Sequence, residues 1–400
     1  LLGALLLLVP WATAPGVHLR FLDALFTATS AVCVTGLIVM DTPHEFTLFG
    51  QLIILFLIQV GGLGYSIMAT LLLLALGQRI GLRERLLMAE ALSTMDMAGL
   101  VRFVKTVVII TFSLEGVGAV LLSLRFSGDH PPLTALYYGV FHAISAFNNA
   151  GFALFSDSLG GYRGDLTVNL VVTTLVILGG IGFLVFTDVL DNLKGHRFRF
   201  TTHTKLVVVV TVILLVAGTL GIWVLEWNNH QTLEPLPVGE QLLSSYFQSV
   251  SRTSGFSTLD LSEMRDATLY LLIMLMAIGG SPGSTAGGIK TTVFGIVCLS
   301  MWTILRQRAD VEVFHRRISN DLVVRATCLA VLAMATVTFF TLLLAYTEGK
   351  SFLAVMFEVT SAIGIVGLSV GDGQARSLSA LFTDFGKVVI ILSMLLGRFG

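Results

Sequence analysis

The chain has 400 residues, of which 55% are hydrophobic and 12% are charged, and its mean hydropathy is +0.88. Because soluble domains carry about a quarter charged residues, this composition excludes an ordinary water-soluble fold and indicates that lipid surrounds much of the chain. A formal net charge of −1 excludes a strongly basic nucleic-acid binder. The three cysteines lie in apolar stretches without a CxxC pair, which indicates neither a disulfide framework nor a zinc site: Cys33, Cys298 and Cys328.

Long apolar segments alternate with short, half-polar ones along the chain. The long segments occupy residues 1–13, 50–76, 103–124, 168–190, 204–225, 268–305, 322–346 and 384–400. Between alternate pairs lie the short segments, 21–33, 132–147, 239–251 and 350–361. A membrane crossing needs about 20 helical residues, so we interpret the short segments as re-entrant helices, which are tolerated where they line a cavity. Both ends of the chain fall inside apolar runs, and we expect the natural chain to extend beyond them.

Each re-entrant segment carries the same pattern, a phenylalanine four residues before a serine and a glycine shortly after. The members are Phe26, Phe141, Phe247 and Phe357, then Ser30, Ser145, Ser251 and Ser361, then Gly36, Gly151, Gly255 and Gly367. Coincidence of common residues is the alternative, but the glycines recur at intervals of 115, 104 and 112 residues. We therefore predict an all-α integral membrane protein with four pseudo-symmetric M1–P–M2 repeats (helix, re-entrant pore loop, helix) around one central ion pore. The predicted repeats are residues 1–78, 79–192, 193–308 and 309–400.

Charge patterning predicts the orientation of these repeats. Lys and Arg outnumber Asp and Glu in the segments that join the repeats, 77–105, 191–205 and 306–325, whereas acidic residues prevail in the re-entrant loops. Because positive loops stay in the cytoplasm, the joining segments are predicted to face the cytoplasm and the re-entrant loops to face outward. The predicted location is the plasma membrane, crossed many times.

The four glycines predict a filter for potassium ions. A ring of backbone carbonyls replaces the hydration shell of the ion, and glycine accepts the unusual φ/ψ values that turn carbonyls inward. The predicted filter strings are Val34-Thr35-Gly36, Asn149-Ala150-Gly151, Thr253-Ser254-Gly255 and Ile365-Val366-Gly367. An aspartate follows each glycine by five or six residues, namely Asp41, Asp157, Asp260 and Asp372. A carboxylate ring at an outer mouth would concentrate cations, and solvated loop charge is the alternative that their common offset argues against.

These strings carry a family resemblance over essentially the whole chain. Residues 30–37 (SAVCVTGL), 147–152 (FNNAGF), 251–258 (SRTSGFST) and 366–371 (VGLSVG) resemble the four filter loops of the Trk/Ktr/HKT superfamily of potassium transporters, most closely its Ktr branch. The resemblance implies potassium uptake, a homodimer, and a separate cytosolic ring of the RCK type that binds ATP or ADP. Sodium-preferring relatives carry serine at the first filter glycine, so Gly36 favours potassium, with sodium as a candidate activator.

A glycine-rich segment interrupts the apolar run 268–305. It reads Gly279-Gly280-Ser281-Pro282-Gly283-Ser284-Thr285-Ala286-Gly287-Gly288-Ile289-Lys290. Five glycines and a proline break any ordinary helix, so this second helix of the third repeat is predicted to be broken, with its middle facing a cavity. A phosphate-binding Walker loop is the competing interpretation, but Ile289 intrudes before Lys290 and breaks that motif. The resemblance implies that the segment is an intramembrane gate.

Three charged residues lie in apolar surroundings: Glu115, Lys290 and Arg398. Such charges mark pathways or internal pairs. The resemblance implies that Arg398 narrows the pore beside the gate, whereas the alternative is an anchor that snorkels to the membrane interface. Glu115 requires a polar partner that the sequence does not identify. The strings 61–64 and 179–182 are glycine-rich, and we interpret them first as close helix packing and second as kinks around a cavity.

Other functional classes have little support in the sequence. The eight histidines show no metal-ligand spacing and no Ser/His/Asp set is visible, so no enzyme is predicted, and an intramembrane enzyme is the alternative from another class. The absence of an arginine ladder disfavours a voltage-gated channel. Coupling of potassium to sodium or protons, or a less selective potassium/sodium pathway, stays open. The arginines at 79, 83, 85, 316 and 317 are candidate contacts for the cytosolic partner.

Overall fold

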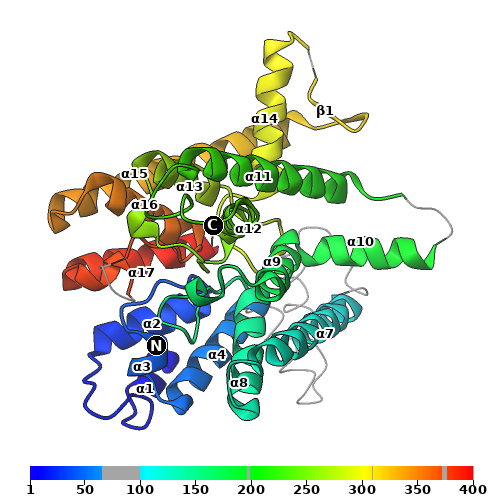
Figure 1. Cartoon of the computed structure of the whole chain (residues 1–400). Coiled ribbons are helices and arrows are strands. Elements are labelled where there is room, and N and C mark those ends of the chain that lie inside the picture. Colours follow the sequence, from blue (N-terminus) through cyan, green and yellow to red (C-terminus); the bar gives the residue numbers. More distant parts are fainter. Residues whose placement is uncertain (65–99, 196–198, 309, 372–375, 400) are drawn as a thin grey trace.

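The computed structural model describes all residues except 65–99, 196–198, 309, 372–375 and 400. Helices dominate the described residues, among which the only sheet is a two-stranded hairpin of β1 (Glu312–Val313) and β2 (Arg316–Arg317). The predicted all-α fold class is confirmed. Figure 1 shows the first helices, from α1 to α8, in the lower half of the molecule and α11 to α16 in the upper half.

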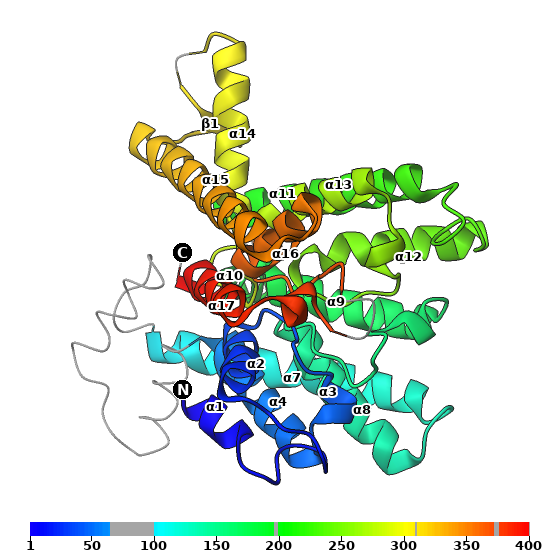
Figure 2. The same ribbon diagram turned by 90° about the vertical axis from the view of Figure 1, so that its left-hand side faces the viewer.

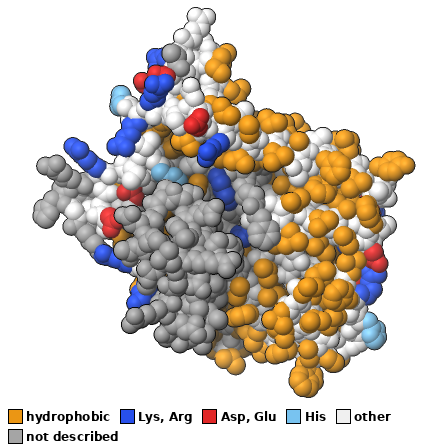
Figure 3. Space-filling model, turned by 180° about the vertical axis from the view of Figure 1, so that it is seen from behind, with side chains coloured by type: hydrophobic (Ala, Val, Ile, Leu, Met, Phe, Trp, Pro, Cys, Tyr) orange, Lys and Arg blue, Asp and Glu red, His pale blue; other side chains and the backbone are white. Residues whose placement is uncertain are grey.

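Three helices of the described residues are long and apolar enough to cross a membrane by themselves. They are α7 (Leu100–Phe126), α11 (Thr202–Glu226) and α15 (Asn320–Glu348). The Thr201 hydroxyl accepts a hydrogen bond from the Thr204 N–H and caps the start of α11. Large apolar side chains point away from the molecule along all three helices, and Figure 3 shows hydrophobic side chains covering much of one face. An apolar surface of this extent requires lipid rather than water.

Four short helices lie where the re-entrant segments are predicted. They are α2 (Phe21–Cys33), α8 (Pro132–Phe147), α12 (Val238–Val250) and α16 (Phe352–Gly364). Their 13 to 16 residues correspond to about 20–24 Å at about 1.5 Å per residue, less than the roughly 30 Å of a hydrocarbon core. Each observed boundary lies within three residues of the predicted one.

Two of the expected spans are broken in the middle. α9 (Leu166–Ile181) and α10 (Phe183–Lys194) are bent by 91° where Gly182 adopts a φ of 96°. The interpretation of residues 179–182 as helix packing first and a kink second is therefore corrected, because the chain both packs closely and bends there. In the third repeat, α13 (Asp266–Ala277) and α14 (Thr291–Leu305) are separated by the glycine-rich segment. α14 and the hairpin project away from the other helices (Figures 1 and 2).

The remaining apolar runs form α1, α4 and α17. The run 1–13 forms only the six-residue α1 (Leu2–Leu7), and the run 50–76 begins as α4 (Leu48–Leu63), beyond which it lies outside the described residues from 65. The last apolar run forms α17 (Asp384–Phe399). Short turns complete the fold: α3 (Thr42–Glu45), η1 (Gly160–Tyr162), η2 (Ser251–Thr253), η3 (Leu261–Glu263) and η4 (Leu378–Leu381).

Each phenylalanine of the predicted repeat packs its short helix against helices from another part of the chain. All four are at most 1% exposed, and each is buried in an apolar cluster built mainly by other helices. Phe26 of α2 lies in the cluster of α16 and α17, and Phe357 of α16 lies in that of α11 and α13. Phe247 of α12 lies with α7, α8 and α9, and Phe141 of α8 lies with α1, α2 and α4. The four clusters link each short helix to helices of a neighbouring predicted repeat, and together they close a circle.

Candidate functional site

Four glycines meet where the loops after the short helices converge: Gly36, Gly151, Gly255 and Gly367. Their φ angles are positive, between 69° and 93°. A Cβ atom placed on each glycine would lie 2.9 to 3.3 Å from the Cα of the next, in chain order and from the last back to the first. It would also overlap the carbonyl oxygen of the residue that precedes the next glycine. These oxygens belong to Ala150, Ser254, Val366 and Thr35. Only glycine fits this closed set, which we call the glycine ring.

Three of the four loops reach the ring by the same turn. Each helix is followed within two residues by a residue in the left-handed region, Val34, Asn149 or Ile365, with φ between 55° and 62°. The next N–H then donates to the carbonyl of the repeat serine, Ser30, Ser145 or Ser361, at 2.8 to 2.9 Å. The hydroxyls of Ser30 and Ser361 also accept from the N–H groups of Gly36 and Gly367, at 3.1 and 3.0 Å. The repeated serine therefore fixes the turn into the ring.

The third loop is built differently. α12 continues into the 3₁₀ turn η2, and the Gly255 N–H donates to the Ser251 carbonyl at 3.3 Å. This tighter turn fits the spacing from Phe247 to Gly255, which is two residues shorter than the spacing from phenylalanine to glycine in the other loops. Arg252 is buried in this turn, and its guanidinium donates to the carbonyls of Ile278 and, at 3.3 Å, Gly279. Sequence reasoning missed Arg252, although a charged residue inside a predicted filter loop was a usable signal.

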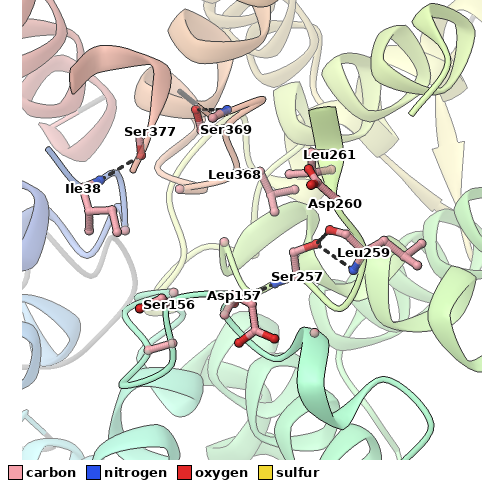
Figure 4. Close-up of a pocket in the computed structure, with 18 of the residues that line it drawn as sticks. Ile38, Ser156, Asp157, Ser257, Leu259, Asp260, Leu261, Leu368, Ser369 and Ser377 are labelled. Atoms are coloured by element: carbon pink, nitrogen blue, oxygen red, sulfur yellow. Dashed lines mark hydrogen bonds between the residues drawn. The ribbon is translucent and has the colours of Figure 1, made fainter. Parts of the chain in front are cut away.

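A cavity of about 750 Å³ opens on one side of the ring (Figure 4). It is lined by the four ring glycines and by residues that follow them in each loop. We call it the vestibule. Its walls are tied together between loops: Ile38 and Ser377 exchange two hydrogen bonds of 2.9 Å, and the Leu159 N–H donates to the Ser257 carbonyl at 2.9 Å. Segments hundreds of residues apart therefore form one rim.

The predicted aspartates divide into three that line the vestibule and one that lies outside the described residues, Asp372. Asp41 accepts from the Ser156 hydroxyl at 2.7 Å and contacts His44 at 2.7 Å, so it joins the first and second loops. Asp260 accepts from the N–H and hydroxyl of Ser262 and caps η3. Asp157 is exposed. Arg163 and Arg376 line the same vestibule, so its wall is not purely acidic.

The glycine-rich segment fills the break between α13 and α14. Its base is closed by bonds from the Gly279 N–H to the Ile289 carbonyl, 2.8 Å, and from the Gly280 N–H to the Gly287 carbonyl, 3.0 Å. The middle of the segment binds next to the bend between α9 and α10, because the Ser281 N–H donates to the Gly180 carbonyl at 2.9 Å. A Cβ atom on Gly182 would lie 2.6 Å from the Pro282 carbonyl oxygen. Close approach of these two segments therefore requires glycine at the bend.

The same segment contacts the loops through residues that precede the ring glycines. The Thr285 hydroxyl lies 3.2 Å from the Phe147 carbonyl oxygen and 2.7 Å from the Asn149 side-chain amide. A Cβ atom on Gly287 would lie 2.5 Å from the Ile365 side chain. The vestibule is lined instead by the ring glycines and the residues after them. The ring thus has an open side and a side occupied by the chain itself.

Both predicted cations bind to this segment. The Arg398 guanidinium donates to the Thr285 carbonyl at 2.9 Å and to the Gly61 carbonyl of α4, and the Lys290 ammonium donates to the Ala286 carbonyl at 3.1 Å. The snorkelling alternative for Arg398 does not fit this geometry, because its charged end points to the segment.

Glu115 finds its partner at the end of α8. The Asn148 amide donates to Glu115 at 2.9 Å and to Gln59 of α4 at 3.2 Å. The side chain of Asn148 also occupies the space into which a Cβ atom on Gly62 would project, so the expected close packing at residues 61–64 is observed for this glycine. Nothing in the sequence pairs these residues, since they lie in three separate helices.

The family model for TrkH, described as a cation transport protein, matches residues 7–400. The chain belongs to this family. Over its whole length it is 42% identical to the Ktr system potassium uptake protein B of Bacillus subtilis, covering 88% of that relative. It is 41% identical to the protein of the same name from Vibrio alginolyticus, covering 86% of it. The predicted family resemblance is confirmed, and the reported relatives are named as transport proteins rather than enzymes.

A solved structure shares the fold. The crystal structure of the potassium transporter TrkH from Vibrio parahaemolyticus matches with a TM-score of 0.74 over 95% of this chain and 76% of that chain, at 21% sequence identity. The chain is thus an integral membrane protein of the TrkH fold.

Proposed function

We propose that this chain takes up potassium across the plasma membrane through a channel-like path that passes through the glycine ring. The observation that carries the proposal is the closed ring, in which each glycine lies against a carbonyl of the next loop. Such a ring of backbone oxygens replaces the hydration shell of a potassium ion without burying a full charge. The printed names of the two relatives, both potassium uptake proteins, support potassium as the substrate.

In this proposal the filter consists of the ring glycines and the two residues before each. The short helices α2, α8, α12 and α16 all end at the ring, so the partial negative charge at their carboxyl ends adds to the attraction for a cation. The vestibule is the outer mouth, and Asp41, Asp157 and Asp260 on its wall raise the local cation concentration. The acidic loops then face outward and the basic joining segments face the cytoplasm.

The glycine-rich segment, with Lys290 and Arg398, is the proposed gate in a closed position. It lies against the ring on the side away from the vestibule, and two fixed cations bind to it. A cation on the path raises the electrostatic barrier to potassium, and moving it aside lowers that barrier. The segment is irregular backbone held by hydrogen bonds, both its own and those to the α9–α10 bend, which suits a part that moves.

Regulation is proposed to come from a separate subunit. A cytosolic ring that binds ATP or ADP would dock on the basic face, for which Arg316 and Arg317 are exposed on the projecting hairpin (Figure 2). The arginines at 79, 83 and 85 lie outside the described residues. The printed names of both relatives assign them to a Ktr system as its protein B, which supports a further protein as partner of this chain. A homodimer and activation by sodium belong to the same proposal.

The decisive test is cation flux through the purified chain in proteoliposomes, with potassium and sodium gradients varied independently. Potassium entry down its own gradient, without a sodium or proton gradient, is the expected result. Potassium entry only with a sodium or proton gradient would replace the channel-like path by coupled transport. Adding the candidate partner with ATP or ADP tests regulation, and identical flux with both nucleotides would contradict it.

A further inference from the structure

Thr285 joins the proposed gate to the proposed filter. It is fully buried in the middle of the glycine-rich segment. Its hydroxyl contacts the second loop, 3.2 Å from the Phe147 carbonyl oxygen and 2.7 Å from the Asn149 amide. Its carbonyl accepts from Arg398 at 2.9 Å. One residue therefore contacts a filter loop through its side chain and the fixed cation through its backbone.

Asn149 carries this contact to the ring. It occupies the left-handed region, with φ of 58°, and its next neighbour Ala150 presents the carbonyl that lies against Gly36. Its amide also lies 3.3 Å from the hydroxyl of Thr253 in the third loop. Thr285, Asn149 and Thr253 thus form a row of polar groups from the gate through two of the four loops.

We propose that Thr285 is a specificity-determining residue, through which the position of the gate sets the selectivity of the filter. When the segment leaves the ring, Asn149 loses its partner at 2.7 Å, and the second and third loops lose a restraint on their carbonyl positions. Because coupling between two sites is reciprocal, an ion that orders the second loop also favours the gate position in which Thr285 binds it. This inference rests on the proposed function.

The test replaces the hydroxyl and keeps the shape. Thr285→Val is expected to lower the potassium-to-sodium permeability ratio about fivefold, the size of one net hydrogen bond, and to raise flux without the partner. Thr285→Ser keeps a hydroxyl and is expected to have the permeability ratio of the wild type. Thr327→Val is the matched control, because among the described residues its hydroxyl bonds only to the Val323 carbonyl of its own exposed helix turn, at 2.9 Å.

A second variant approaches the same contact from the filter. Asn149→Gly removes the amide and still accepts the positive φ. If both variants act through one contact, the double variant Thr285→Val/Asn149→Gly has the permeability ratio of the more affected single variant. Fully additive effects would overturn the coupling. If Thr285→Val folds poorly, Asn149→Gly alone still tests the coupling, because loss of the contact with Thr285 should raise flux without the partner as well as lower the ratio.

Failure of this inference differs from failure of the proposed function. Thr285→Val with raised flux and an unchanged ratio would refute the coupling and leave a gated potassium path intact. A wild-type chain that conducts no potassium would refute the proposed function itself. Arg398→Ala separates the two contacts, because it frees the Thr285 carbonyl and keeps the hydroxyl contact. Its flux should rise with a smaller change in ratio than that of Thr285→Val.

Discussion

The two sides of the glycine ring are built on different principles. The vestibule side is a cavity of about 750 Å³, and hydrogen bonds from serine side chains and from the backbone join the loops of its rim. The other side is filled by the glycine-rich segment, which is bound by Arg252, Lys290 and Arg398. Three aspartates line the open side together with Arg163 and Arg376, whereas Arg252, Lys290 and Arg398 hydrogen-bond to carbonyls on the occupied side. In the proposed path, the aspartates attract cations on one side, and the chain with its positive charges blocks them on the other.

The difference matters because the two sides respond to different perturbations. The rim joins the loops that follow the short helices, so a change at the rim leaves the occupied side in place. The glycine-rich segment is bound to the α9–α10 bend, to the second loop and to Arg398, so a change at one of these partners acts directly on the proposed gate. We therefore expect the largest effects on flux from the occupied side, accompanied by a loss of selectivity where Thr285 is removed. Changes at the ring and the open side should act on selectivity or salt dependence.

The largest effect is expected from Arg398→Ala. Two unit charges about 4 Å apart repel by about 4 kcal/mol at an effective dielectric near 20, and each 1.4 kcal/mol or so is tenfold in rate. Potassium flux without the partner should rise at least about tenfold on this scale. Arg265→Ala is the matched control, since that arginine also binds two backbone carbonyls, those of Leu225 and Asn228, but is exposed. A folded Arg398→Ala chain that conducts no faster would place the barrier elsewhere.

Deleting residues 281–287 tests the same side without changing Arg398. The ends of the deletion are already neighbours, because the Gly280 N–H donates to the Gly287 carbonyl at 3.0 Å. Flux should rise as in Arg398→Ala. The deletion also removes Thr285, so selectivity should fall, which proteoliposome flux with potassium and sodium measures. Wild-type selectivity in a fast-conducting deletion would contradict the link between gate and filter.

A smaller effect is expected on stability where α2 meets α17. Lys387 of α17 donates to Asp23 of α2 at 2.7 Å, with both side chains at most 12% exposed. Lys387→Met should cost about 3 kcal/mol, the lower end for breaking a buried pair, because Asp23 keeps Arg20 at 3.0 Å. Arg20→Gln, at a half-exposed position, should cost under about 1 kcal/mol. Thermal unfolding in detergent measures both, and equal losses would contradict the difference in burial.

The ring itself is tested by Gly36→Ser. The new side chain would overlap the Ala150 carbonyl oxygen and displace it, so the potassium-to-sodium permeability ratio should fall about fivefold while flux persists, equivalent to roughly 1 kcal/mol. Gly16→Ser provides the control, because Gly16 also has a positive φ, 86°, but its added Cβ would meet nothing within 4 Å. Unchanged reversal potentials in Gly36→Ser would argue against a filter at this ring.

The smallest effect is expected at the mouth. Asp157→Asn should reduce potassium flux by about twofold at low ionic strength and by less at high salt, because the screening length falls to about 10 Å at 0.1 M. Asp266→Asn removes an exposed charge at the start of α13 that does not line the vestibule. Equal salt dependence in the two variants would show that the vestibule charges do not concentrate ions.

The sequence by itself predicted the elements and the residues that meet at the ring. The four short helices were placed within three residues, because apolar content, length and glycine punctuation are local properties. The repeated glycines marked positions that need a positive φ, and the glycine-rich segment marked a broken helix. The boundaries of the four repeats, and the roles of filter and gate, stay predictions for the experiments above.

Only the tertiary structure decided which groups touch. The circle of phenylalanines, the bend at Gly182 that receives Pro282, and the contact of Thr285 with Asn149 all join residues far apart in the chain. The pair of Asp23 with Lys387 was missed for the same reason. A local pattern reports how a residue is folded into its own helix or turn, whereas the partner of a buried polar group depends on packing between helices that periodicity does not encode.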